Sequence, residues 1–230
     1  MRRALGLSII SAAALAACTS GPGTRGWRDL RPTANPSAVI AAELAFARAA
    51  QEKGQWTAFR EYATRDAVMF VPRPVNAQDW LRQQTNPAEA VKWQPYQVWS
   101  SCDGSFVVST GGATYPGGAQ SNFMTVWQKQ DNGEYRWVLD QSLPHAERTF
   151  AADTIGAAVA DCPASRRGGP IEVRRGENWR SGASNDRTLE WTTQLDADCS
   201  RVVTVRMVQD GKLEEVLRVN APSPGAAACA

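Results

Sequence analysis

Histidine is almost absent from this sequence: His145 is the only one among 230 residues. A hydrolase that activates a serine or cysteine nucleophile through a histidine base would have to use it. His145 follows Leu143-Pro144 in a segment with the composition of a surface loop, and no G-x-S-x-G motif accompanies it. Phosphate-binding loops and dinucleotide-binding glycine motifs are absent from the sequence too. The sequence therefore predicts no catalytic residue and no cofactor.

Clusters of basic residues are also lacking, since only short pairs such as Arg166-Arg167 and Arg174-Arg175 occur. A nucleic-acid-binding surface needs a gathered stripe or patch of Lys and Arg. Without Arg2 and Arg3 the count of Lys and Arg falls from 25 to 23, which equals the 23 Asp and Glu. We therefore expect no nucleic-acid partner.

Residues 1–18, MRRALGLSIISAAALAAC, form a leader with two arginines followed by a short apolar run. The run over 5–17 is shorter than the roughly 20 residues that span a membrane. Leu15-Ala16-Ala17-Cys18 resembles the lipobox of bacterial lipoproteins, which implies cleavage before Cys18 and acylation of this cysteine. Thr19-Ser20 rather than Asp follow, which by the same resemblance favours the periplasmic side of the outer membrane. An ordinary secretory peptide that ends in Cys is the alternative.

Besides Cys18 the sequence has four cysteines, and these are Cys102, Cys162, Cys199 and Cys229. None forms a C-x-x-C pair and His145 is remote from all of them in sequence, so we expect no metal site. In an oxidising compartment an even number of cysteines predicts disulfides. Three connectivities are open. We expect Cys162 to pair with Cys199, because both flank the C-terminal strands, which leaves Cys102 for Cys229.

Composition and periodicity divide the chain into six segments. We expect a signal peptide over 1–17, lipidated Cys18 with a flexible tether over 18–34, a folded domain over 35–145, a connector over 146–187, a small β module over 188–220 and a mobile tail over 221–230. Apolar residues at three- and four-residue spacing predict a helix from Asn35-Pro36 to Gly54. A short helix over 56–63, a strand over 67–71 and a third short helix over 76–81 follow.

Alternation with a period of two begins near residue 92 and predicts four antiparallel strands. Their expected bounds are 92–101, 105–115, 120–129 and 134–142. Asp131-Asn132-Gly133 is a strong hairpin signal between the last two. Both faces of these strands carry apolar residues. Helices would cover one face, so a partner subunit or the C-terminal segment would have to cover the other.

Several motifs of this domain carry a resemblance to a known family. They are Glu43-Leu44-Ala45-Phe46, Lys53-Gly54, Asp66-Ala67-Val68-Met69-Phe70, Pro74-Val75-Asn76, Thr125-Val126-Trp127-Gln128-Lys129-Gln130 and Trp137-Val138-Leu139-Asp140. In order and spacing they resemble the nuclear transport factor 2-like (NTF2-like) superfamily, in particular its SnoaL-like or DUF4440 branch, over residues 35–143. The resemblance implies an α+β fold in which a cone-shaped, curved antiparallel sheet wraps three N-terminal helices around an apolar pocket.

Enzymes of this superfamily, such as ketosteroid isomerases and polyketide cyclases, place a carboxylate or histidine in the pocket. Asp140 alone among the candidate carboxylates lies within a predicted strand, but it shares strand parity with Arg136, so we expect a structural ion pair. The expected pocket lining is Tyr62, Trp80, Trp99, Trp127 and Asp140. We therefore expect a protein that binds a small apolar or amphipathic molecule or an envelope partner. The alternatives are an acid–base enzyme (isomerase, dehydratase or hydrolase) in the same pocket, or a structural module that forms a homodimer through the sheet face.

The lipid anchor predicts that Cys18→Ala abolishes lipoprotein processing, because the acylated thiol is lost. Cell fractionation should then find the variant outside the membrane fraction, with the parent inside it. A variant that is still cleaved before residue 18 and stays in the membrane fraction would contradict the lipoprotein interpretation.

Overall fold

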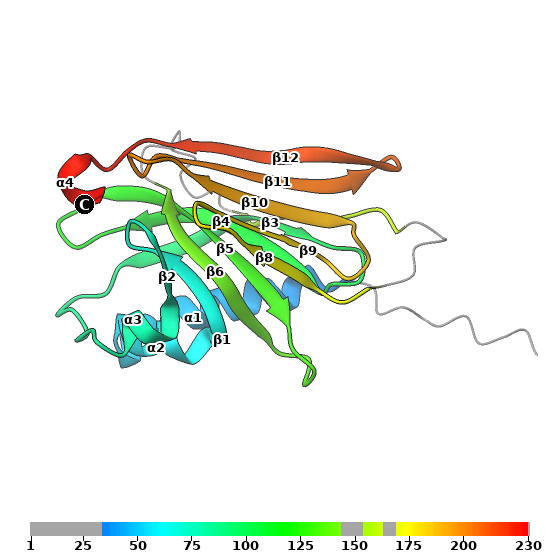
Figure 1. The fold of residues 1–230 in the computed structure, drawn as a ribbon. Coiled ribbons are helices and arrows are strands. Elements are labelled where there is room, and N and C mark those ends of the chain that lie inside the picture. The colour runs from blue at the N-terminus through cyan, green and yellow to red at the C-terminus, as the bar shows by residue number, and fades with distance from the viewer. Residues whose placement is uncertain (1–33, 144–153, 163–168, 230) are drawn as a thin grey trace, which may run out of the picture. The chain divides into compact units, whose positions relative to one another are not determined.

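The structure is a computed structural model that describes residues 34–143, 154–162 and 169–229 (Figure 1). The predicted signal peptide, the lipidation site Cys18, most of the tether and His145 lie outside the described residues. Within the described ranges, no helix is long and apolar enough to cross a membrane.

Three helices open the folded chain, and their bounds agree with the predicted ones. They are α1 (Pro36–Lys53), α2 (Gln55–Tyr62) and α3 (Ala77–Leu81). Pro36 stands in the first turn of α1, where proline removes no intrahelical hydrogen bond. Gly54 separates α1 from α2 with a φ of 98°, which favours glycine. The side chain of Asn86 then accepts from the N–H of Trp56 at 2.8 Å, at the start of α2.

Sheet A contains the five strands predicted between residues 67 and 142, and two more. Its strands are β1 (Ala63–Phe70), β2 (Pro74–Asn76), β3 (Lys92–Ser100), β4 (Phe106–Thr114), β5 (Gln120–Lys129), β6 (Tyr135–Leu143) and β7 (Gly156–Val159), in the order β2-β1-β6-β5-β4-β3-β7. The meander β3 to β6 is antiparallel, while β1 pairs with β6 and β7 with β3 in parallel. The hairpin turn falls between β5 and β6, as predicted. The expected α+β class is confirmed.

Sheet B follows and is larger than the expected β module. It contains β8 (Glu172–Arg175), β9 (Trp179–Ala183), β10 (Leu189–Leu195), β11 (Arg201–Gln209) and β12 (Lys212–Ala221), in the order β12-β11-β10-β9-β8. The segment 146–187, which we expected to be a connector, contains the strands β7, β8 and β9. These strands are short and rich in Ala, Arg and Gly, so they have few of the β-branched and aromatic residues typical of strands.

The two faces of sheet A are buried against different partners. Val107, Trp127 and Trp137 pack in one apolar cluster with Phe46 of α1. Residues of the opposite face pack in a second cluster with sheet B, and these include Val108, Met124, Val126, Leu139, Leu189, Trp191, Val203 and Met207. In Figure 1 the helices lie below sheet A, and β10, β11 and β12 lie above it. The C-terminal segment therefore covers the face that we expected a partner or this segment to cover.

A β-bulge at Val138 changes which residues of β6 share a face. Val126 pairs with Leu139 and Trp127 with Trp137, so Val138 is an extra residue without a partner on β5. Beyond the bulge Asp140 pairs with Thr125, and it lies on the helix-facing side together with Trp137. Simple alternation had placed Asp140 on the side of Arg136, and the bulge makes that prediction wrong.

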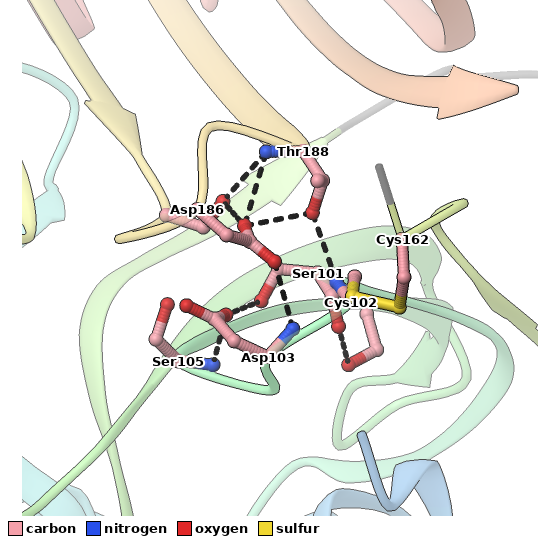
Figure 2. Close-up of a disulfide and its surroundings, with 9 residues drawn as sticks. Ser101, Cys102, Asp103, Ser105, Cys162, Asp186 and Thr188 are labelled. Carbon is pink, nitrogen blue, oxygen red and sulfur yellow. Dashed lines mark hydrogen bonds between the residues drawn. A yellow bond between two sulfur atoms is a disulfide. The ribbon is translucent and has the colours of Figure 1, made fainter. Parts of the chain in front are cut away.

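A buried carboxylate joins the two sheets where the β3–β4 turn meets the β9–β10 turn (Figure 2). Asp186 is 2% exposed. Its Oδ2 accepts from the N–H of Asp103 at 2.8 Å, and its Oδ1 accepts from the hydroxyls of Ser184 and Thr188 at 2.7 and 2.8 Å. The Thr188 hydroxyl oxygen in turn accepts from the N–H of Cys102 at 2.8 Å. One side chain of sheet B thus fixes the position of a turn of sheet A.

Two disulfides are present, but their connectivity differs from the predicted one. Cys102 pairs with Cys162 and Cys199 with Cys229, at Cα–Cα distances of 5.3 and 5.7 Å. The predicted pairs Cys162–Cys199 and Cys102–Cys229 are therefore wrong. Strand β7 runs beside β3 and brings Cys162 to the end of β3 at Cys102. The tail is not free either, because α4 (Ala226–Cys229) brings Cys229 to the β10–β11 turn, where it is 5% exposed.

Peptide mapping of the unreduced protein should recover these two disulfides. They close loops of 60 and 30 residues, for which chain entropy gives a stabilisation of about 4 kcal/mol each. Replacing Cys102 and Cys162 by Ala should therefore lower the free energy of unfolding in urea by up to about 4 kcal/mol. A peptide that links Cys162 to Cys199 would contradict the observed connectivity.

Candidate functional site

A cavity of about 170 Å³ opens beside α2, at the ends of β1, β4 and β6 and the starts of β3 and β5. Its apolar lining consists of Trp56, Phe59, Met69, Phe70, Val71, Val91, Trp93, Ala113 and Phe123. Its polar lining consists of Gln55, Tyr115, Asn122, Asp140, Gln141 and Ser142. Mostly apolar walls with a few polar groups are typical of small-molecule sites. The volume suits a single six-membered ring, since engineered cavities of about 150 Å³ take up benzene.

Asp140 is the only acidic residue in this lining. Its Oδ2 accepts a hydrogen bond of 2.8 Å from the hydroxyl of Thr125, and the carboxyl group is partly buried. The pKa of Asp140 is raised to about 7, mainly by burial and in smaller part by the negative charge of Glu43, while the hydrogen bond from Thr125 opposes the rise. A group with this pKa is present in both protonation states near neutral pH, so it can donate or accept a hydrogen bond in the cavity.

The expected ion pair between Asp140 and Arg136 is not formed. Arg136 lies on the other side of the Val138 bulge, where its guanidinium pairs with Glu134 at 3.8 Å and donates to the carbonyl of Glu61. No group of three or more His, Cys, Asp or Glu side chains gathers as a metal site anywhere in the described ranges.

Glu43 of α1 is a second carboxyl group near the cavity, and sequence reasoning did not single it out. It is fully buried. The indole N–H of Trp93 donates to Oε1 at 2.8 Å, and the Ser109 hydroxyl and the Trp127 indole N–H donate to Oε2 at 2.6 and 3.0 Å. Burial raises the pKa of Glu43, and these three hydrogen bonds oppose the rise.

The sequence does contain a signal for Glu43. The buried positions of α1 are Val39, Glu43, Phe46, Ala49 and Ala50. Glu43 is thus a charged residue within the apolar stripe of an amphipathic helix, at the four- and three-residue spacing of its neighbours. A carboxyl group at such a position needs hydrogen-bond donors within the core, because burying it without them is costly. Its place in the apolar stripe therefore predicts a buried polar contact.

Of the five residues expected to line the pocket, the structure places only Asp140 in the lining of this cavity. Tyr62 packs on Phe46 at a ring distance of 5.1 Å, and Trp80 packs on Trp56 at 5.3 Å. Trp127 is fully buried and is bonded to Glu43.

Trp99 lies on the opposite face of sheet A, in the cluster shared with sheet B. Trp93 and Trp99 have the same parity along β3, but Pro95 pairs with Gly111 and Gln97 with Thr110, so Tyr96 is an extra residue between them. This irregularity turns Trp99 away from the cavity that Trp93 lines.

No protein-family model matches the chain, and no curated protein matches it. Among solved structures, the chain is similar to a "putative ketosteroid isomerase" from Parabacteroides distasonis, with 13% identity and a TM-score of 0.38, over 49% of this chain and 94% of that one. It is also similar to a "putative aromatic ring hydroxylase" from Novosphingobium aromaticivorans, with 11% identity and a TM-score of 0.36, over 48% and 89%. Both TM-scores are below 0.5, so these likenesses do not indicate a function for the chain.

The raised pKa of Asp140 predicts how stability depends on pH. The carboxyl proton of Asp140 is held more tightly in the folded chain than in the unfolded chain, where the pKa of this group is 3.8. Its contribution to the free energy of unfolding is therefore full below about pH 4 and is lost as the pH rises through about 7. Asp140→Asn cannot ionise. Urea unfolding at pH 8 should find this variant about 1–3 kcal/mol more stable than the parent, which is less than the whole shift would give because the carboxyl group is only partly buried. At pH 4.5 the gain should be much smaller.

Asp131→Asn, in the exposed β5–β6 turn, is the matched control and should follow the parent at both pH values. A difference between Asp140→Asn and the parent that is the same at pH 4.5 and pH 8 would contradict the assignment.

Proposed function

We propose that this chain is a ligand-binding protein of the NTF2-like superfamily, with the cavity beside α2 as its binding site. The order of elements supports this family: two helices, a strand, a short helix and a four-stranded meander follow one another as the resemblance implies. The helices cover one face of that meander. The proposal includes that sheet A has the cone form of this superfamily and that the chain belongs to its SnoaL-like or DUF4440 branch.

The cavity indicates the kind of ligand. Its walls are mainly aromatic and aliphatic, and the position of the Asp140 carboxyl group among them is the single observation that carries the proposal. A charged molecule would lose its hydration in such a site, so the ligand is neutral, about the size of one ring, and carries a polar group that meets Asp140.

We further propose that the protein works as a lipid-anchored lipoprotein on the periplasmic side of the bacterial outer membrane. The leader and Cys18 support this location. The chain enters the folded part at Ala34, whose N–H donates to the carbonyl of Cys102 at 3.1 Å. This turn lies at the opposite end of β3 and β4 from Trp93 and Ala113, which line the cavity. An anchor at that end would leave the cavity open to solutes.

An acid–base enzyme is the second candidate, and the pKa of Asp140 is the observation that favours it, since a general acid or base works best with a pKa near the operating pH. A homodimer through the sheet face has less support. Sheet B of the same chain covers that face, so a dimer would need another surface.

Cyclohexanone and cyclohexanol are suitable probes, because the ketone only accepts a hydrogen bond whereas the alcohol also donates one. Cyclohexanone needs a protonated Asp140, so we expect its affinity to fall about tenfold from pH 5.5 to pH 8.5, as the loss of one hydrogen bond gives. The affinity of cyclohexanol should change much less. The indole N–H signals of Trp56 and Trp93, followed by NMR during titration, report the binding, with Trp191 of sheet B as an internal reference.

Ala113→Leu should abolish binding because it fills the cavity, and Ala157→Leu on the exposed side of β7 is the matched control. If neither probe binds the parent chain, the ligand proposal is wrong. If a probe is converted to a product and the conversion stops in Asp140→Asn, the enzyme candidate replaces it.

A further inference from the structure

A row of polar side chains crosses sheet A from the buried Glu43 to the cavity. Ser109 on β4 pairs directly with Thr125 on β5, and Thr125 with Asp140 on β6. Adjacent strands lie about 4.8 Å apart, and all three residues are on the helix-facing side. Glu43 bonds to the Ser109 end of this row at 2.6 Å, and Asp140 bonds to Thr125 at 2.8 Å. The two carboxyl groups are therefore ends of one short polar path through an otherwise apolar core.

The two carboxyl groups differ in how well they can hold a negative charge. Glu43 receives three hydrogen bonds, from Trp93, Ser109 and Trp127, whereas the structure gives Asp140 one, from Thr125. Donors stabilise the ionised form of a carboxyl group. The indole N–H groups can only donate, so they favour a carboxylate over a carboxylic acid at Glu43.

We propose that Glu43 and Asp140 are a coupled carboxyl pair, in which Glu43 carries the negative charge inside the core and Asp140 carries the proton that faces the cavity. Two carboxylates that interact through an apolar region resist being ionised together. Glu43 is thus a positioning residue that keeps a hydrogen-bond donor available at Asp140. The repulsion between the two charges is among the causes that raise the pKa of Asp140.

Ser109 allows the pair to take up a second proton. If Glu43 is protonated, its acid hydrogen can be accepted by the Ser109 hydroxyl oxygen, which lies 3.5 Å from the carbonyl oxygen of Thr125 and can donate to it instead. Neither indole could accept that hydrogen. Rotation of one hydroxyl group thus serves both protonation states of Glu43.

Other charged or titratable groups near Asp140 come from few elements. The lining residues of α2 and β1 are uncharged, and β4 contributes Tyr115. Arg201 of β11 lies behind the wall, with its guanidinium 5.0 Å from the ring centroid of Phe70 and 2.6 Å from the carbonyl oxygen of Ser142. Glu43 is the charged group among the causes that raise the pKa of Asp140.

The inference rests on the proposed function for its purpose, but its test needs no ligand. The midpoint of the Asp140 titration can be followed through the ¹³C shift of its carboxyl carbon in labelled protein. In Glu43→Gln we expect this midpoint to fall by about one pH unit, because the repelling charge is gone. Glu134→Gln, an exposed substitution of the same chemistry in the β5–β6 turn, is the control and should leave the midpoint unchanged.

An unchanged or higher midpoint in Glu43→Gln would overturn the pair. If that variant does not fold, Ser109→Ala serves instead: it removes one donor from Glu43, makes its charge harder to hold, and should also lower the midpoint of Asp140, while an unchanged midpoint there would equally overturn the proposal. Loss of cyclohexanone binding with the titration shift intact would instead count against the ligand proposal alone.

Discussion

Sheet A is apolar on both faces, and the need to bury both of them is the constraint on which the rest of the structure depends. Each buried Val, Leu or Met side chain contributes about 1.5–3 kcal/mol, so an uncovered face would forfeit much of the stability of the chain. The helices bury one face, and sheet B buries the other. The buried Asp186 then fixes sheet B at one end of the interface.

The chemistry of the cavity follows from irregularities in this packing. Without the bulge at Val138, Asp140 would face sheet B, and the cavity would have no acidic group. The extra residue at Tyr96 similarly leaves Trp93 in the cavity wall and sends Trp99 to the other core. Bulges that re-aim side chains are common beside functional sites. Here two of them decide which side chains a ligand would meet.

Much of the fold could be predicted from the sequence, because its signals are local. Asn35-Pro36 and Gly54 mark the ends of α1, and Asp131-Asn132-Gly133 marks the β5–β6 turn. The site was harder to predict, and Asp140 alone was correctly placed in the lining. A bulge has no compositional signal, and one extra residue inverts the parity of everything beyond it.

Two other features depend on contacts between distant parts of the chain. The disulfide connectivity follows from the parallel pairing of β7 with β3, which no local pattern of residues 156–159 indicates. The role of Glu43 depends on donors from β3, β4 and β5 that lie far from it in sequence. Propensity and periodicity describe neighbours along the chain, so they do not predict contacts between residues that are distant in sequence.

Arg201 ties the cavity to a part of the chain that does not line it. It is 7% exposed, has no carboxylate partner among the described residues, and donates from sheet B to the carbonyls of Pro72 and Ser142. These two hydrogen bonds fix the guanidinium group of Arg201, and they also fix the backbone beside the cavity to sheet B. The evolutionary consequence is that the C-terminal sheet cannot diverge as an independent appendage: any change in how β11 sits on sheet A also reshapes the cavity.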